Sequence, residues 1–108
     1  MDPHTLRRKF LGGLLAGLRV VWPILSVLIG LITALGLVIG LIEGWSVRES
    51  IYFAYVTGLT IGYGDHVPKA FPTRALAIGI GFCGVMLTAL LAAISVKALA
   101  AATDQPPR

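Results

Sequence analysis

The chain has little charge and almost no cysteine. Of its 108 residues, 13% are charged, 56% are hydrophobic and one, Cys83, is a cysteine. Soluble domains carry about 25% charged residues, so this composition is too apolar for an ordinary soluble domain, and one cysteine rules out an intrachain disulfide. The two histidines, His4 and His66, lie too far apart in sequence to suggest a metal site or a general base. We expect no enzyme activity, no nucleic-acid partner and no small-molecule substrate.

Two long runs without charge account for most of the hydrophobic residues. Residues 24–42 and 75–96 supply 19 and 22 uncharged positions. A helix rises about 1.5 Å per residue, so each run can cross a hydrocarbon layer of about 30 Å. The sequence therefore predicts an all-α integral membrane protein with spanning helices at residues 22–44 and 73–100.

The ends of the chain differ from these runs in charge. Four basic residues precede the first run: Arg7, Arg8, Lys9 and Arg19. This bias places both termini in the cytoplasm, and we expect a prokaryotic inner membrane. Residues 1–21 combine these charges with Leu and Phe, as in an amphipathic segment on the inner leaflet, although glycines lower its helical stability. Residues 103–108 are expected to be a disordered tail.

A third helix is predicted in the segment between the two runs. Ser46 and Glu49 have the spacing of a capping box, which predicts a helix over residues 47–59. At roughly 20 Å, this helix is too short to cross the bilayer. It must stop part-way and return through the stretch "TIGYGD".

The glycines of this stretch allow left-handed backbone angles. If left- and right-handed residues alternate, five successive carbonyls face one axis. Non-helical backbone at membrane depth is tolerated only where protein buries it or where it lines an aqueous path. A dehydrated cation needs a cage of oxygens, and one strand offers one oxygen per level. Several copies must therefore surround the axis.

"TIGYGD", at the end of a short re-entrant helix between two spans, resembles the pore domain of two-transmembrane tetrameric potassium channels. The resemblance implies a pore domain over residues 22–102, a homotetramer among membrane lipids and potassium as the only bound ion. The implied selectivity filter is residues 60–64, where backbone oxygens replace the hydration shell of potassium. Its ion-binding residues are Thr60, Ile61, Gly62, Tyr63 and Gly64, with potassium held by the first four and by the Thr60 hydroxyl.

Three residues beside this filter are expected to support it. Some family members have a Glu where this chain has Val56, so the Glu–Asp pair of those members cannot form. Tyr52 lies one helical turn earlier and is expected to hydrogen bond to Asp65; the alternative is that Tyr52 only packs and Asp65 is solvated. The Tyr63 ring is expected to pack around Tyr52 and Phe53. His66 is expected to be a solvated loop residue.

The resemblance also assigns positions on the second span. Gly84 lies where the family has a gating hinge, and close helix packing is an equally good interpretation of this glycine. Thr88, Ala92 and Val96 follow at one-turn intervals and are expected to line the cavity and inner mouth.

A second function remains open at this stage. Gly36, Gly40 and Gly44 form a ridge of small residues on the first span, which is typical of helix-packing surfaces in membranes. The alternative to a channel is therefore a structural transmembrane adaptor without conduction, but it leaves the 32-residue segment between the spans, residues 43–74, without a role.

Overall fold

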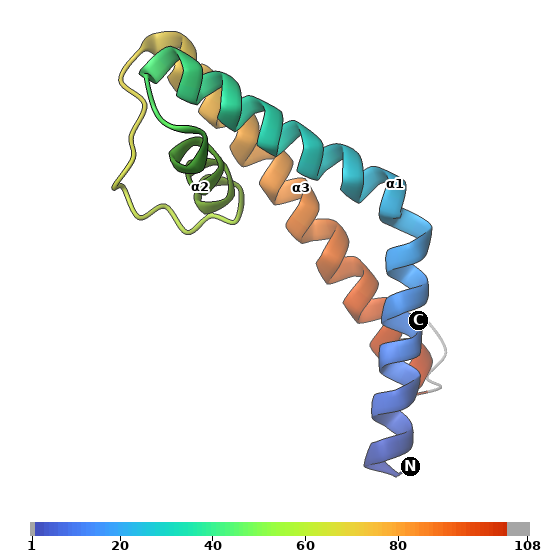
Figure 1. Ribbon diagram of the computed structural model, residues 1–108. Helices are drawn as coiled ribbons and strands as arrows, with labels where there is room; N and C mark the ends of the chain where they lie inside the picture. Colours follow the sequence, from blue (N-terminus) through green and yellow to red (C-terminus); the bar gives the residue numbers. More distant parts are fainter. Residues whose placement is uncertain (1, 104–108) are drawn as a thin grey trace. The chain divides into compact units, whose positions relative to one another are not determined.

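The computed structural model describes residues 2–103, which form three helices (Figure 1). α1 spans Pro3–Glu43, α2 spans Val47–Gly58 and α3 spans Phe71–Ala102. No strand occurs within this described range. α1 and α3 are each long and apolar enough to cross a membrane. The prediction of an all-α protein with a short helix between two long ones is confirmed.

α2 begins where the capping box predicts. The Ser46 hydroxyl accepts a hydrogen bond from the Glu49 backbone N–H at 3.1 Å, and Glu49 Oε1 accepts one from the Ser46 N–H at 3.0 Å. The helix ends at Gly58, one residue before the predicted end. α3 is longer than predicted by two residues at each end. Of the predicted disordered tail, residues 104–108 lie outside the described residues.

The expected interfacial segment and the first span are one continuous helix, α1. The chain nevertheless divides into two compact units. The middle unit is residues 25–88, and the terminal unit joins residues 1–24 to residues 89–108. On α1 the division follows Pro23, which lacks a backbone N–H and so interrupts helical bonding. That residues 1–21 lie on the membrane surface stays a prediction.

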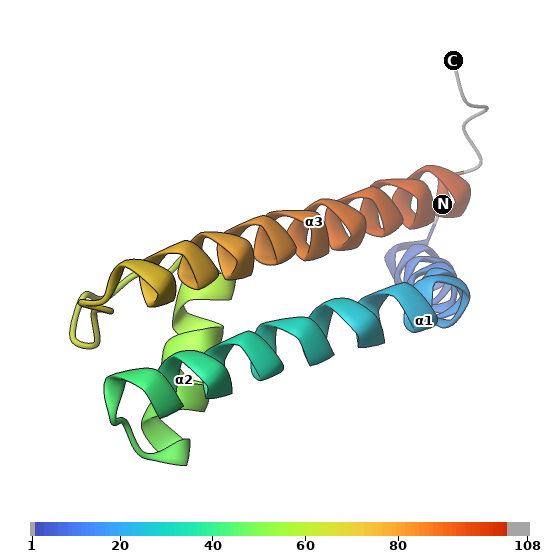
Figure 2. The same ribbon diagram turned by 90° about the horizontal axis from the view of Figure 1, so that it is seen from above.

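In the middle unit, α2 crosses α1 and α3 on one side of the pair (Figure 1 and Figure 2). The core of this unit takes side chains from all three helices: Ile32 and Ile39 from α1, Phe53 and Ala54 from α2, and Ile80 from α3. Each is no more than 6% exposed. α2 therefore packs against both long helices.

The small-residue ridge on α1 forms the seat for α2. A Cβ added at Gly36 would lie 2.5 Å from the Ala54 Cβ, and one added at Gly40 would overlap the Ser50 hydroxyl. Neither Gly36 nor Gly40 therefore has room for a side chain larger than the hydrogen of glycine. Gly44 has another role: its φ of +77° and the hydrogen bond from the Trp45 N–H to the Gly40 carbonyl (2.8 Å) end α1 in a Schellman motif.

A glycine-to-alanine pair on α1 tests this seat. Gly40→Ala should lower the thermal unfolding midpoint in detergent, because overpacking costs about 1–3 kcal/mol. Gly30→Ala is the matched control, since nothing lies within 4 Å of a Cβ at Gly30; it should leave the midpoint unchanged or raise it. The midpoints are measured by circular dichroism, and equal midpoints for the two variants would contradict the packing described for α2.

Candidate ion pathway and its supports

The backbone that follows α2 alternates in handedness. Thr60, Gly62 and Gly64 have φ values of +62°, +60° and +80°, whereas Ile61 and Tyr63 do not have positive φ. A non-glycine residue with positive φ, such as Thr60, is uncommon and costs about 1–2 kcal/mol. The alternation predicted for this stretch is present, and the strain at Thr60 must be compensated by neighbouring contacts.

The carbonyl of Val56 supplies the main anchor for residues 60–64, an extended segment that is not part of a β-sheet and is called the strand from here on. It accepts hydrogen bonds from the backbone N–H groups of Ile61 (2.9 Å) and Gly62 (3.2 Å). The Thr60 N–H donates to the Thr57 carbonyl at 3.1 Å. Three consecutive N–H groups of the strand are thus satisfied by the end of α2. Val56, whose side chain lacks the carboxylate of some channels, supports the strand through its backbone.

The strand is open on its other side in a single chain. Ile61 is 47% exposed and Tyr63 is 68% exposed. The Phe53 ring packs on Trp45 at a centroid distance of 5.0 Å, and the expected packing of the Tyr63 ring around Tyr52 and Phe53 stays a prediction. Phe53 is only 6% exposed and belongs to the core of the middle unit.

Tyr52 and Asp65 lie close enough to act on each other's ionisation, while the hydrogen bond expected between them stays a prediction. The Asp65 carboxylate is the largest influence that raises the pKa of Tyr52. For Asp65, partial desolvation raises the pKa, but the Tyr52 hydroxyl and backbone N–H groups, with the nearby His66, outweigh it and lower the pKa. The carboxylate that follows the strand is therefore held in its ionised form.

His66 is not the solvated residue that was expected. Its side chain is 23% exposed, and its Nε2 lies 2.8 Å from Glu49 Oε2. The ring meets Trp45 and Tyr52 edge-on, with centroids 5.4 and 5.8 Å apart. Its Nδ1 is buried and 3.7 Å from Asp65 Oδ2, too far for a hydrogen bond.

Glu49 thus serves two partners with its two oxygens. Oε1 completes the capping box and Oε2 binds His66. The hydrogen bond from the Ser46 N–H, followed by that from His66, lowers the pKa of Glu49 to about 2. The capping box predicted the position of Glu49 at the start of α2. No pattern in the sequence indicates that the chain later brings His66 beside Glu49.

A second carboxylate, Glu43, ties the end of α1 to the start of α3. Its Oε1 accepts hydrogen bonds from the N–H groups of Lys69 (2.7 Å) and Ala70 (3.0 Å) and from the Thr73 hydroxyl (2.6 Å). Thr73 is fully buried. The role of Glu43 was not predicted from the sequence, in which the available signal was a single acidic residue at the end of an apolar run. The segment after the strand is therefore fixed at His66 and again at Lys69–Ala70.

Gly84 lies directly against the last turn of α2. A Cβ added at Gly84 would overlap the backbone carbonyl of Gly58. This close approach to Gly58 supports the interpretation of Gly84 as a packing residue. A hinge at Gly84 stays a prediction. One turn later, the Thr88 hydroxyl donates to the Gly84 carbonyl at 2.9 Å.

The other residues expected to line the cavity belong to the terminal unit. Ala92 and Val96 are exposed in one chain, and Val96 is 67% exposed. Their role as cavity lining stays a prediction. Within residues 2–103, no group of three or more His, Cys, Asp or Glu residues could hold a metal ion.

These features define a membrane domain of two apolar helices with a re-entrant helix and an anchored, alternating strand between them. A protein family described as "Ion channel" matches residues 19–101. The match covers both long helices, α2 and the strand. The chain belongs to this ion channel family and is an integral membrane protein.

Shorter parts of the chain are similar to curated potassium channels. Potassium channel subfamily K member 16 of Mus musculus is 52% identical over 33 residues, which are 31% of this chain and 11% of that protein. Potassium channel subfamily K member 10 of Homo sapiens is 45% identical over 53 residues, or 46% of this chain and 10% of that protein. A TWiK family potassium channel of Caenorhabditis elegans is 42% identical over 48 residues, which are 44% of this chain and 8% of that protein. The chain spans about a tenth of the length of these relatives, and no solved structure matches it.

The link between Glu49 and His66 predicts a pH-dependent effect of mutation. Folding lowers the pKa of Glu49 from 4.5 to about 2, so its carboxylate stabilises the folded protein above pH 4.5 and loses this effect as the pH falls toward 2. Glu49→Gln should lower the unfolding midpoint at pH 6, and the difference from the unmodified chain should shrink as the pH falls from 4.5 toward 2. A difference that stays constant over this range would contradict the assigned hydrogen bonds.

The contact between Gly84 and Gly58 predicts that two glycines of α3 differ in how well they tolerate replacement by alanine. Gly84→Ala should displace the end of α2 and lower the thermal unfolding midpoint, with an overpacking cost of about 1–3 kcal/mol. Gly81→Ala on the same helix is the control, because a Cβ there meets nothing within 4 Å. A stable Gly84→Ala variant, measured beside Gly81→Ala, would show that the close approach is not required.

Proposed function

We propose that the chain is the pore-forming subunit of a potassium-selective channel. Four copies surround one axis, and potassium passes through passively, without enzymatic chemistry. The backbone oxygens of Thr60, Ile61, Gly62 and Tyr63, with the Thr60 hydroxyl, replace the hydration shell of the ion. Gly64 completes the strand at its outer end. Potassium is the only cofactor that this function needs.

The observation that carries this proposal is the alternating strand held by the Val56 carbonyl. Alternating left- and right-handed residues turn successive carbonyls to one side, and the two N–H bonds to Val56 leave those carbonyls available. No side-chain carboxylate is needed within the strand. Such a row of carbonyls suits a weakly hydrated monovalent cation.

The need for several copies follows from the exposure of this strand. Each level of one strand provides one oxygen, whereas a dehydrated cation needs a cage. The Tyr63 ring, 68% exposed in the single chain, would also be covered by a neighbouring copy. Non-helical backbone open to lipid is not tolerated, so the assembled tetramer resolves both problems.

Three contacts would then support the strand during conduction. The Tyr52 hydroxyl holds Asp65 beside the outer end, and Glu49 holds His66. At the inner end, Gly84 lets α3 pack against Gly58. Below this contact, Thr88, Ala92 and Val96 line a water-filled cavity, toward which the C-terminal end of α2 directs its partial negative charge.

The distribution of charge suggests the orientation of the channel. Arg7, Arg8 and Lys9 precede the apolar part of α1 and Lys97 lies near the end of α3, which favours both ends in the cytoplasm. The strand then opens to the outer face of the membrane. A prokaryotic inner membrane suits this orientation.

The adaptor alternative is weaker than the channel on one specific observation. Gly36 and Gly40, which suggested an intermolecular packing ridge, are already occupied by Ala54 and Ser50 of α2. The ridge therefore serves to seat the re-entrant helix, as a channel requires.

Purified protein in lipid vesicles tests the function. The unmodified chain should release potassium down its gradient at least tenfold faster than sodium and should have the mass of a tetramer by light scattering in mild detergent. Gly62→Ala should reduce potassium flux by about tenfold or more, because a left-handed alanine costs roughly 1–2 kcal/mol in each of four copies. Gly12→Ala, a helical glycine with nothing within 4 Å of its Cβ, should conduct normally.

Two results would contradict the proposal. A monomeric mass would remove the cage of oxygens, and equal flux of sodium and potassium would remove the selectivity. Tetramers that conduct neither ion would favour the adaptor.

A further inference from the structure

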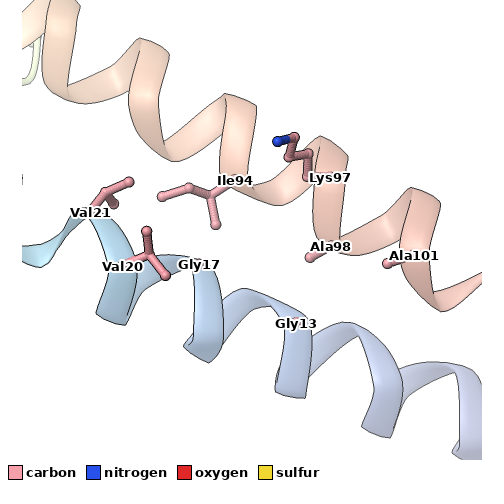
Figure 3. A pocket seen from close by; sticks show the side chains of 8 residues that line it. All are labelled: Gly13, Gly17, Val20, Val21, Ile94, Lys97, Ala98 and Ala101. Carbon is pink, nitrogen blue, oxygen red and sulfur yellow. The ribbon is translucent and has the colours of Figure 1, made fainter. Parts of the chain in front are cut away.

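Small and apolar side chains bring the helices of this chain together. In the terminal unit, Gly17 of α1 faces Ile94 of α3 beside an apolar hollow, and a Cβ added at Gly17 would lie 2.5 Å from the Ile94 side chain (Figure 3). In the middle unit, Gly36 of α1 faces Ala54 of α2 in the same way. Apolar contacts of this kind set how closely two helices approach, but they have no preferred direction. They therefore leave a helix free to turn or slide by a small amount.

One contact between α1 and α2 is directional, because it is a hydrogen bond. The hydroxyl oxygens of Thr33 on α1 and Tyr55 on α2 lie 2.8 Å apart. The Thr33 hydroxyl donates to the Ile29 carbonyl at 2.9 Å, and a hydroxyl has only one proton to donate. The Tyr55 hydroxyl is therefore the donor to Thr33, and the Thr33 oxygen is held as an acceptor by its own helix.

This pair of hydroxyls lies in apolar surroundings. Thr33 is the central residue of the uncharged run 24–42, and Tyr55 packs against the core of the middle unit. A hydroxyl that loses its partner in such surroundings costs free energy that water would otherwise offset. The Tyr55 side chain is consequently held at one position along α1.

Tyr55 begins the turn of α2 that holds the strand. The carbonyls of residues 55–57 accept hydrogen bonds from the backbone N–H groups of residues 59–62, at 2.9, 3.1, 2.9 and 3.2 Å in that order. A shift of Tyr55 would move these carbonyls, because they belong to the same turn of one helix. Thr60, with its strained φ of +62°, would relax if these bonds lengthened. The hydrogen bond to Thr33 therefore links α1 to the conformation of the strand.

We propose that Tyr55 and Thr33 are positioning residues for potassium binding, and this inference rests on the proposed function. Their hydrogen bond fixes the last turn of α2 against α1 and so keeps residues 60–62 in the alternating conformation before the ion arrives. Neither side chain needs to touch the ion. The apparent affinity of a ligand falls in proportion to the fraction of the protein that is ready to bind it. Loss of this bond therefore weakens potassium binding, while an occupied strand conducts at its usual rate.

Potassium flux through the protein in lipid vesicles, measured over a range of potassium concentrations, tests the proposal. Tyr55→Phe keeps the ring and removes the donor. It should raise the half-saturating potassium concentration about fivefold or more, the factor of one typical hydrogen bond, and leave the maximal flux per protein nearly unchanged. Ser26→Ala, which removes an exposed hydroxyl from α1, is the control and should change neither value.

Variants of the acceptor provide the matched comparison. Thr33→Val keeps the shape of the side chain and should produce the same shift as Tyr55→Phe, whereas Thr33→Ser keeps the acceptor and should behave as the unmodified chain. The double variant Tyr55→Phe/Thr33→Val should shift no further than either single variant, because all three lack the same bond. If Tyr55→Phe does not fold by circular dichroism, the comparison of Thr33→Val with Thr33→Ser decides the same question.

Three results would overturn this inference while leaving the proposed function intact. The first is an unchanged half-saturating concentration in Tyr55→Phe and Thr33→Val. The second is a lower maximal flux without a change in that concentration, which is the effect of a bond that only stabilises the fold. The third is an additive shift in the double variant. An unmodified chain that passes no potassium would contradict the proposed function itself and this inference with it.

Discussion

The structure depends on one constraint: irregular backbone placed at the depth of a membrane must have its polar groups satisfied. Each N–H or C=O left without a partner in hydrocarbon costs several kcal/mol. The chain meets this constraint on one side of the strand through α2, whose Val56 carbonyl accepts from Ile61 and Gly62. On the other side the carbonyls remain open, and in the proposed function ions and water serve as their partners.

Most other features of the middle unit keep α2 in place so that this anchor can work. Gly36 and Gly40 let α1 approach α2, and Gly84 lets α3 approach its last turn. The capping box fixes where α2 begins. Beyond the strand, Glu49 and Glu43 fix the returning segment at His66 and at Lys69–Ala70. The strand is thus held at its start by backbone bonds and beyond its end by two carboxylates.

The features that the sequence predicted are those set by local patterns. Uncharged runs gave two long helices, the Ser46–Glu49 spacing gave the start of α2, and the glycines gave the alternation around Gly62. Contacts between distant residues were harder to predict. Glu43 and His66 find their partners 26 to 30 and 17 residues away, and no local pattern indicates which carboxylate meets which donor.

The central claim is that this strand selects potassium when copies of the chain surround it. The most direct test is the reversal potential of the unmodified protein in a planar bilayer with potassium on one side and sodium on the other. The account predicts a value near the potassium equilibrium potential. A value near zero in channels that conduct would show that the carbonyls of residues 60–63 do not discriminate between the two ions, and would contradict it.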